Sequence, residues 1–310
     1  SDSTIIIMEP IKTIHNDGLS HFHPLIRDWF GRTIGPPTGI QTQAWPVIAA
    51  GHHCLVIAPT GSGKTLTAFL WGLDQLISRH WPSGQISLLY ISPLKALNTD
   101  IRNNLSLPLQ GIEGRFEESG QPFHPVRIMT RSGDTPRDER LEMLRHPPEI
   151  LITTPESLNL LLNSPQARTV LGSVRSVILD EIHAIADQKR GVYLMAALER
   201  LAHMAGEFQR IALSATVDPP ERMAELIGGY LNDDPSRPDH YHPRSVSLIR
   251  SSDTKHYQVM VRRPPELRER MINQSVLPPL SEEFRRISTL NHSTLFFTNT
   301  RRMCEKITWM

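Results

Sequence analysis

The feature that most constrains the fold is an alternation of short apolar runs with longer segments of helical periodicity, starting near residue 51. The candidate strands are the apolar runs 54–58, 86–92, 126–130, 149–153, 176–180 and 210–216. Each is followed by a segment able to form a helix, at 64–79, 94–104, 136–145, 156–163, 191–204 and 220–227. Runs that are apolar on both faces and separated by helices indicate a parallel sheet covered on two sides. The sequence therefore predicts a doubly wound α/β domain, with ligands at the carboxyl ends of its strands.

The composition of the sequence changes after residue 231. A polar, proline-rich stretch, NDDPSRPDHYHPR, is typical of a surface loop, and strand-like runs follow at 245–249 and 256–261. The last stretch, STLFFTNTRRMCEKITWM, predicts one strand entering one helix. The roughly 60 residues of 253–310 are too few for a complete parallel α/β domain. We therefore expect a first domain over 1–252, and over 253–310 a linker with the truncated start of a second domain.

Composition fits an ordinary globular protein, with 39% apolar and 21% charged residues. No apolar run approaches the ~20 residues that span a membrane, and the first residues lack the pattern of a secretory signal. Cys54 and Cys304 lie in a strand-like and a helix-like run, which favours reduced core thiols and a cytoplasmic setting. The net charge of +1 does not by itself indicate nucleic acid, so any such contact must come from particular loops.

The run CLVIAPTGSGKT is a variant of the phosphate-binding loop. The usual pattern is Gly, four residues, then Gly-Lys-Ser/Thr, whereas Ala58 stands first here, before Gly63, Lys64 and Thr65. Gly61 and Gly63 would let backbone N–H groups converge on phosphate oxygens, and a helix starting near Lys64 would present its positive end to them. Lys64 would neutralise the β- and γ-phosphates, and the Thr65 hydroxyl would ligate magnesium. The alternative is a strand–turn–helix that is merely rich in glycine.

The run SVILDEIH supplies the carboxylates that such a loop needs. Asp180 ends an apolar strand, where it can hold magnesium through water. Glu181 follows directly and can polarise a water for attack on the γ-phosphate. A strand ending in a solvated acidic pair is the alternative. Together the two motifs predict hydrolysis of ATP with Mg²⁺ as the metal.

Further short motifs follow the other strands. They are SPLKAL, TRSGD, TTPESL and LSAT, and PTGIQTQAWP precedes the phosphate loop. In this order they resemble the superfamily 2 helicases of the DEAD/DEAH-box type, over nearly the whole chain. The stretches DEIH, FHPLIRDWF, GIQTQAWP and KRGVYLMAALERL look most like the N-terminal motor domain of the large helicase-related (Lhr) family. The resemblance implies a RecA-like sheet followed by the truncated start of a second RecA-like domain.

The resemblance also implies roles within the ATP site. Gln41 would recognise adenine. Asp180 and Glu181, together with Lys64, would act on the magnesium ion and on the attacking water. The triphosphate would be held by Thr60, Gly61, Ser62, Gly63, Lys64 and Thr65.

Coupling and nucleic-acid contacts are implied in the same way. Ser214 and Thr216 would couple the nucleotide state to strand separation through a hydrogen bond to His183. Loops of this kind bind phosphates through helix N-termini, hydroxyls and a few cations, without reading bases. For each loop an ordinary strand-to-helix turn is the alternative. The implied contacts are Pro93, Lys95, Arg131, Thr154, Pro155, Ser157, Thr298 and Arg301.

The implied function is an ATP-dependent 3′–5′ helicase acting on single-stranded or tailed DNA, with RNA and RNA–DNA hybrid as open alternatives. A nucleotide-gated clamp or remodeller that separates no strands is the rival, and a binding module is a third reading. The paired arginines of the second helicase domain have no counterpart before Met310. Comparable hydrolases lose about 10³–10⁵ in rate without such a residue. We therefore expect the 310-residue chain to turn over ATP poorly without the missing C-terminal part of its own chain.

Overall fold

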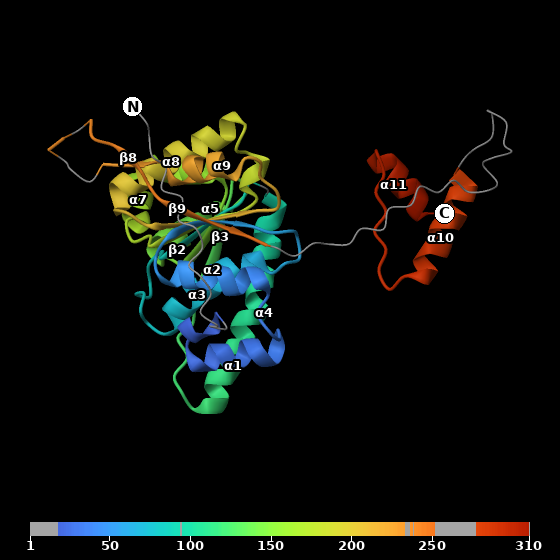
Figure 1. Cartoon of the computed structure of the whole chain (residues 1–310), viewed down its shortest axis with the longest axis horizontal. Coiled ribbons are helices and arrows are strands. Elements are labelled where there is room, and N and C mark those ends of the chain that lie inside the picture. Colours follow the sequence, from blue (N-terminus) through green and yellow to red (C-terminus); the bar gives the residue numbers. More distant parts are fainter. Residues whose placement is uncertain (1–17, 94, 233–235, 238, 252–276, 310) are drawn as a thin grey trace. The chain divides into compact units, whose positions relative to one another are not determined.

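The structure is a computed structural model that describes residues 18–93, 95–232, 236–237, 239–251 and 277–309. It divides into two compact units, Ser1–Asp253 and Thr254–Met310, and each is described by itself (Figure 1). Among the described residues, no helix combines the length and the apolar character needed to span a membrane.

A sheet of seven parallel strands forms the centre of the first unit, in the order β3-β4-β2-β5-β6-β1-β9 (Figure 1). The strands are β1 (His53–Ile57), β2 (Leu88–Ile91), β3 (Ile128–Arg131), β4 (Ile150–Thr153), β5 (Ser176–Leu179), β6 (Gln209–Ser214) and β9 (Val246–Arg250). The six predicted strands are confirmed, and the strand-like run 245–249 is confirmed as β9, a seventh strand beside β1. A separate antiparallel pair joins β7 (Tyr230–Leu231) to β8 (His242–Pro243).

Helices cover both faces of this sheet; Figure 1 shows α1, α2 and α3 below it and α8 and α9 above it. The first face carries α1 (Pro24–Thr33), α2 (Gly39–Ala49), α3 (Lys64–Ile77) and α4 (Lys95–Ser119). The second carries α5 (Arg137–Arg145), α6 (Pro155–Leu162), α7 (Pro165–Leu171), α8 (Lys189–Ala205) and α9 (Pro220–Gly228). The described part of the unit also contains two 3₁₀ turns, η1 (Leu19–His21) and η2 (Ile182–Ala184).

The central strands are apolar throughout because each of their faces meets a different core. In β2, Leu88 and Tyr90 belong to the core under α1 to α4, whereas Leu89 and Ile91 belong to the opposite core. Successive side chains of a strand point to opposite faces, so a strand buried on both sides cannot alternate with polar residues. This explains why continuous apolar runs predicted these strands.

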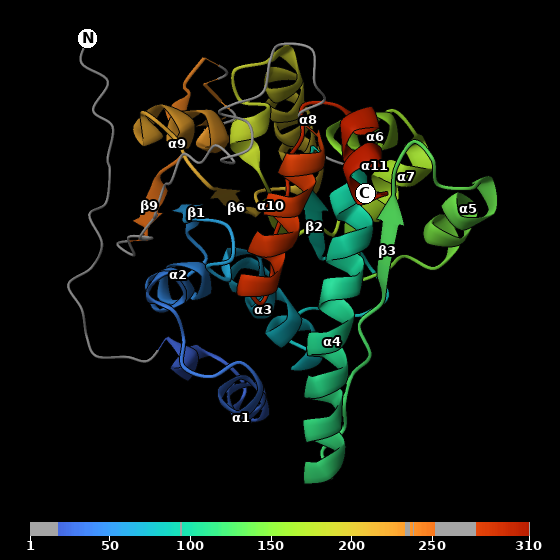
Figure 2. The ribbon, with the colours of Figure 1, turned by 90° about the vertical axis from the view of Figure 1, so that its right-hand side faces the viewer.

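Helix α4 is much longer than the predicted helix at 94–104, because it continues through Pro108 to Ser119. A proline inside a helix removes one hydrogen bond and costs about 3 kcal/mol. Apolar burial offsets this cost, since Ile112 and Phe116 beyond the proline are buried in the core. Figure 2 shows α4 extending past the sheet on the side of α1, which packs against it. Sequence periodicity missed this extension because the proline mimics a helix end.

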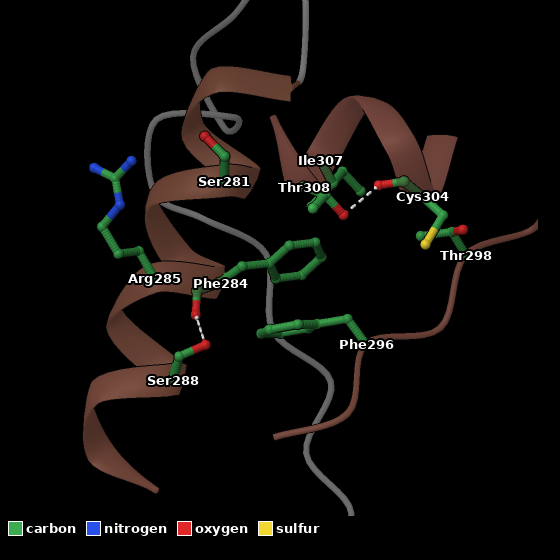
Figure 3. A pocket seen from close by; sticks show the side chains of 9 residues that line it. All are labelled: Ser281, Phe284, Arg285, Ser288, Phe296, Thr298, Cys304, Ile307 and Thr308. Carbon is green, nitrogen blue, oxygen red and sulfur yellow. Dashed lines mark hydrogen bonds between the residues drawn. The ribbon is translucent and has the colours of Figure 1, made fainter. Parts of the chain in front are cut away.

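The described part of the second unit contains α10 (Leu277–Leu290) and α11 (Arg301–Thr308). The rings of Phe284 and Phe296 face each other with centroids 4.4 Å apart (Figure 3). They border a cavity of about 390 Å³, and none of the described residues that line it is acidic. Its lining residues are Ser281, Phe284, Arg285, Ser288, Phe296, Thr298, Cys304, Ile307 and Thr308.

Two predictions for this unit are wrong. The run STLFF forms no strand, and Cys304 is exposed instead of lying in a core. A strand needs a neighbour with which to share hydrogen bonds, and the described part of this unit has no other strand to pair with it. Helix α11 likewise has no buried residue, because no layer of the described part of the unit covers it. The predicted run 256–261 lies outside the described residues.

Candidate nucleotide-binding site

The carboxyl ends of the central strands meet at one edge of the sheet, where the predicted motifs begin. Ile57 of β1 is in register with Ser214 of β6. Leu179 of β5 is in register with both Ile91 of β2 and Ala212 of β6. The loops after these strands therefore lie side by side, at the place where ligands bind open α/β sheets.

The predicted phosphate loop joins β1 to α3 and turns through two glycines in the left-handed region. Their φ angles are 79° at Gly61 and 82° at Gly63, which side chains rarely adopt. A Cβ on Gly63 would also lie 2.8 Å from Nε2 of Gln41, whereas a Cβ on Gly61 would meet nothing within 4 Å. The loop thus has open space beside Gly61 and feeds directly into the N-terminus of α3 at Lys64. This geometry fits a bound phosphate.

Lys64 holds the loop to its own backbone and to the acidic motif. Its side chain is only 5% exposed, and its Nζ donates a hydrogen bond to the carbonyl oxygen of Ala58 at 3.1 Å. The same ammonium lies 3.9 Å from Oε1 of Glu181. A buried ammonium needs such partners, and a phosphate would replace them with stronger ones.

Gln41, the residue predicted to recognise adenine, lies beside the phosphate loop, and its amide is already engaged. It is 2% exposed, and its Oε1 accepts the backbone N–H of Thr38 at 2.9 Å, as part of the capping box of α2. The Thr38 hydroxyl in turn donates to the carbonyl oxygen of Ser62 at 3.2 Å. The Ser62 hydroxyl is buried without a hydrogen-bond partner in the described part of the chain. An adenine that used both ends of the Gln41 amide would therefore have to displace Thr38.

Asp180 follows β5 and is held on both carboxylate oxygens. Its Oδ1 accepts the backbone N–H of Glu181 at 2.8 Å, and its Oδ2 accepts the phenol O–H of Tyr90 at 2.5 Å. Glu181 itself has a φ of 48°, a rare conformation for a residue other than glycine. Such outliers concentrate at functional sites. Tyr90 was missed in the sequence because no motif marks it.

The predicted hydrogen bond between His183 and Ser214 is confirmed. Nδ1 of His183 lies 3.1 Å from the Ser214 hydroxyl, and its Nε2 lies 3.3 Å from Oε2 of Glu181. The Ser214 hydroxyl also lies 3.2 Å from the carbonyl oxygen of Thr216. A continuous polar chain therefore links the acidic motif after β5 to the loop after β6. Thr216 takes part through its backbone, while its side chain is exposed.

Five of the residues predicted to contact nucleic acid are buried at this edge, and three of these, Arg131, Thr154 and Ser157, are polar. Arg131 is 9% exposed, and its Nη1 donates to the carbonyl oxygen of Ser132. Burial and the neighbouring Arg140 lower the pKa of Arg131. Thr154 and Ser157 are also buried, since the Thr154 hydroxyl caps α6 by accepting the N–H of Ser157 at 3.3 Å. In this conformation these side chains organise the loops at the strand ends.

The other predicted contacts are distributed more widely. Pro93 follows β2 and Pro155 begins α6, both at the same edge of the sheet. Lys95 begins α4, but its side chain lies outside the described residues. Thr298 and Arg301 belong to the second unit, where the Thr298 hydroxyl donates to the carbonyl oxygen of Thr300.

Residues 38–224 match the family of DEAD/DEAH box helicases. The chain belongs to this family.

Relatives of similar sequence carry the name Lhr. The chain is 41% identical to "Lhr helicase/probable uracil glycosylase" of Mycolicibacterium smegmatis over 94% of its own length and 19% of the relative. It is 40% identical to "ATP-dependent helicase Lhr-Core protein 2" of Thermococcus barophilus, over 92% of this chain and 32% of the relative. The chain thus spans about a fifth to a third of the length of these relatives.

Solved structures show the same fold. The structure of Mycobacterium smegmatis helicase Lhr bound to ssDNA and AMP-PNP aligns with a TM-score of 0.79 at 41% identity, covering 95% of this chain and 36% of that one. The DUF1998 helicase MrfA aligns with a TM-score of 0.70 at 19% identity, covering 94% of this chain and 40% of that one, and shows the fold alone.

In this DEAD/DEAH box helicase domain, Arg190 joins two of the loops at the strand ends, a role that sequence reasoning missed. Its Nε donates to Oε1 of Glu156 at 2.7 Å, and its Nη2 donates to the carbonyl oxygen of Pro93 at 3.0 Å. Burial alone would raise the pKa of Glu156, but the hydrogen bond and charge of Arg190 outweigh it and lower that pKa. The one signal in the sequence was an arginine at the start of a helix in the stretch KRGVYL.

The residues of this helicase domain fit a magnesium ion that arrives with a nucleotide. Among the described residues, no group of three or more His, Cys, Asp or Glu side chains could hold a metal ion by itself. Mg²⁺ is usually bound by one or two carboxylates together with substrate phosphates and waters. Asp180 at the end of β5 and the Thr65 hydroxyl at the start of α3 match that mode of binding.

Proposed function

We propose that this chain is the N-terminal motor domain of an ATP-dependent helicase of the Lhr type, which moves 3′–5′ along single-stranded DNA and separates strands. The observation that carries the proposal is the junction of Lys64, Glu181 and His183, in which the phosphate loop, the acidic motif and Ser214 form one hydrogen-bonded and ionic chain. The printed names of the relatives, and a relative bound to ssDNA and AMP-PNP, support the proposal.

ATP and Mg²⁺ are the proposed cofactors, and the ion, when bound, supplies positive charge to the phosphates. Lys64 would exchange the carbonyl oxygen of Ala58 for phosphate oxygens, and this exchange would also loosen its hold on Glu181. Glu181 would then orient and polarise the attacking water. Asp180 and Thr65 would hold the ion. Gln41 would bind adenine, and the triphosphate would be held by Thr60, Gly61, Ser62, Gly63, Lys64 and Thr65.

Glu181 also connects the proposed nucleotide site to the loop after β6. Its second carboxylate oxygen contacts His183, which contacts Ser214 in turn. A change in the contacts of Glu181 during hydrolysis would therefore alter the contacts of the loop after β6. We propose that Ser214, Thr216 and His183 couple the nucleotide state to strand separation in this way.

The rest of the proposal concerns the partners. Single-stranded or tailed DNA would bind across the loops of Pro93, Lys95, Arg131, Thr154, Pro155 and Ser157, with RNA as an alternative. Residues 253–310 would be a linker and the start of a second RecA-like domain, in which Thr298 and Arg301 contact the strand. The remaining C-terminal chain would complete the engine. A cytoplasmic location is part of the proposal, in line with Cys54, which is a buried free thiol.

The substitution Glu181→Gln in the full-length protein tests the chemistry. It should leave ATP binding intact and lower turnover by about 10²–10⁴, the usual contribution of a positioned general base. Glu225→Gln, at an exposed position of α9, is the matched control and should turn over normally. Turnover by the Glu181 variant at the wild-type rate would remove Glu181 from this role.

Strand separation is tested on duplexes with a 3′ or a 5′ single-stranded tail. We expect unwinding of the 3′-tailed duplex alone. Movement begins on the single strand, and a motor that moves 3′–5′ reaches the duplex only from a 3′ tail. ATP hydrolysis that single strands stimulate, without any unwinding, would instead favour the nucleotide-gated clamp or remodeller.

A further inference from the structure

Tyr90 lies in the middle of β2 and reaches the end of the neighbouring strand β5. It is in register with Ile178, two residues before Asp180. Residues two apart share a face of a sheet, so Tyr90 and Asp180 are diagonal neighbours within reach of an aromatic side chain. The phenol O–H of Tyr90 donates to Oδ2 of Asp180 at 2.5 Å.

Packing alone does not account for the Tyr90 hydroxyl. The side chain is fully buried, and phenylalanine would occupy nearly the same space. Tyr90 instead uses its hydroxyl as a donor to the Asp180 carboxylate, a hydrogen bond that phenylalanine could not make. The Tyr90 ring stacks on Phe69 of α3 with centroids 5.1 Å apart, which ties it to the helix that starts at the phosphate loop.

We propose that Tyr90 is a positioning residue that fixes the Asp180 carboxylate for Mg²⁺ bound with ATP. This inference rests on the proposed ATP site and deepens it. The two donors, Tyr90 and the N–H of Glu181, each engage a different oxygen of Asp180. An ionised carboxylate has about four acceptor positions, so two remain, and the plane in which they lie is fixed. The waters around a magnesium ion would then donate to Asp180 acceptor positions whose direction is fixed.

A purely structural role for the hydroxyl makes a different prediction. If it only satisfied a buried carboxylate, its removal would lower stability and affect nucleotide binding equally with and without Mg²⁺. If the hydroxyl positions Asp180 instead, its removal should weaken only the part of nucleotide binding that depends on Mg²⁺. Loss of a partner that orients a metal ligand typically lowers metal affinity about 10–100-fold.

The experiment measures binding of a fluorescent ATP analogue to the full-length protein, in EDTA and over a range of Mg²⁺ concentrations. For Tyr90→Phe we expect the affinity in EDTA to stay within about twofold of wild type. The Mg²⁺ concentration giving half-maximal enhancement should rise about tenfold, since Asp180 keeps one of its two donors. Tyr193→Phe on α8, where the side chain is 51% exposed, is the matched control and should match wild type.

A double-mutant cycle with Asp180→Asn completes the test, because two residues that act together are not additive. In that background Tyr90→Phe should cause no further loss of Mg²⁺ dependence, and a further loss of the same size would overturn the inference. An unchanged Mg²⁺ dependence in Tyr90→Phe alone would overturn it as well, while the proposed ATP site would stand. If wild type shows no Mg²⁺-dependent nucleotide binding, the ATP site itself fails.

Discussion

His53, the first residue of β1, shows how a single partly buried ring connects neighbouring strands at their amino ends, away from the candidate site. Its Nδ1 accepts the backbone N–H of Arg210 in the neighbouring strand β6, at 3.1 Å. Burial lowers the pKa of His53 to about 4, and the charges of Arg210 and Arg244 act in the same direction. The folded protein therefore holds this imidazole neutral and resists its protonation.

This depressed pKa makes stability depend on pH in a defined direction. The ordinary histidine pKa is about 6.5, so the unfolded chain takes up a proton between pH 6.5 and about 4 that the folded protein excludes. The contribution of His53 is thus complete above pH 6.5 and is lost as the pH falls toward 4. Its size is at most about 3 kcal/mol. The free energy of unfolding, measured between pH 7 and pH 4, checks this.

His53→Asn keeps an acceptor near the position of Nδ1 and removes the titration. Its free energy of unfolding should fall less steeply with decreasing pH than that of wild type. His52→Asn, at the exposed neighbouring position, is the control and should follow the wild-type slope. Equal slopes for wild type and the His53 variant would contradict the prediction.

At the level of single residues, the sequence was sufficient to place Lys64, Asp180 and Glu181 together, because motifs mark them. The bond between His183 and Ser214 was also predicted. Tyr90 and Arg190 were not, since neither belongs to a pattern. Their contacts exist only because β2 lies between β4 and β5, and the order of strands in a sheet cannot be deduced from equally apolar runs.

At the level of elements, alternation of apolar runs and helices was enough to predict six strands and most helices. It did not predict that β9 completes the sheet beside β1, because a parallel partner far along the chain leaves no local signal. Helix α7 was missed because its seven residues are too few to show periodicity. The run STLFF shows the converse case, since a strand-like sequence forms no strand without a neighbour.

Arg190 and Arg200 allow a test of how α8 positions α6. Arg190 bonds Glu156 at the start of α6, whereas Arg200 bonds the carbonyl oxygen of Leu162 and the side chain of Asn163 at its end. If the loops at the start of α6 contact nucleic acid, as proposed, Arg190→Ala should weaken single-strand binding by the full-length protein about five- to tenfold, the effect of about 1 kcal/mol. ATP binding should not change.

The matched variant Arg200→Ala removes similar bonds on the same two helices, away from the strand ends. It should lower thermal stability about as much as Arg190→Ala and leave strand affinity unchanged. Arg190→Lys should be intermediate, since an ammonium keeps the charge but cannot bridge both acceptors with the same geometry. If both alanine variants lost strand binding equally, the loss would follow from lower stability of the domain, and the specific role of Arg190 would be contradicted.

At the level of the whole molecule, the two units differ in the hydrophobic core that their described residues form. The first contains the entire sheet with a hydrophobic core on each face. The described part of the second has two helices, and large apolar side chains such as Phe297 and Trp309 are almost fully exposed. Burial of apolar surface is the main driving force of folding. The first unit therefore has what a domain needs in order to fold alone.

All residues proposed to bind ATP lie in the first unit, whereas Thr298 and Arg301 lie in the second. A chain of residues 18–251 should therefore unfold cooperatively and bind a fluorescent ATP analogue with an affinity within about threefold of the 310-residue chain, a difference of less than about 1 kcal/mol. Its affinity for single strands should fall further, because it lacks Thr298 and Arg301. Nucleotide affinity more than about tenfold weaker in the shorter chain would show that residues after 251 contribute to the ATP site.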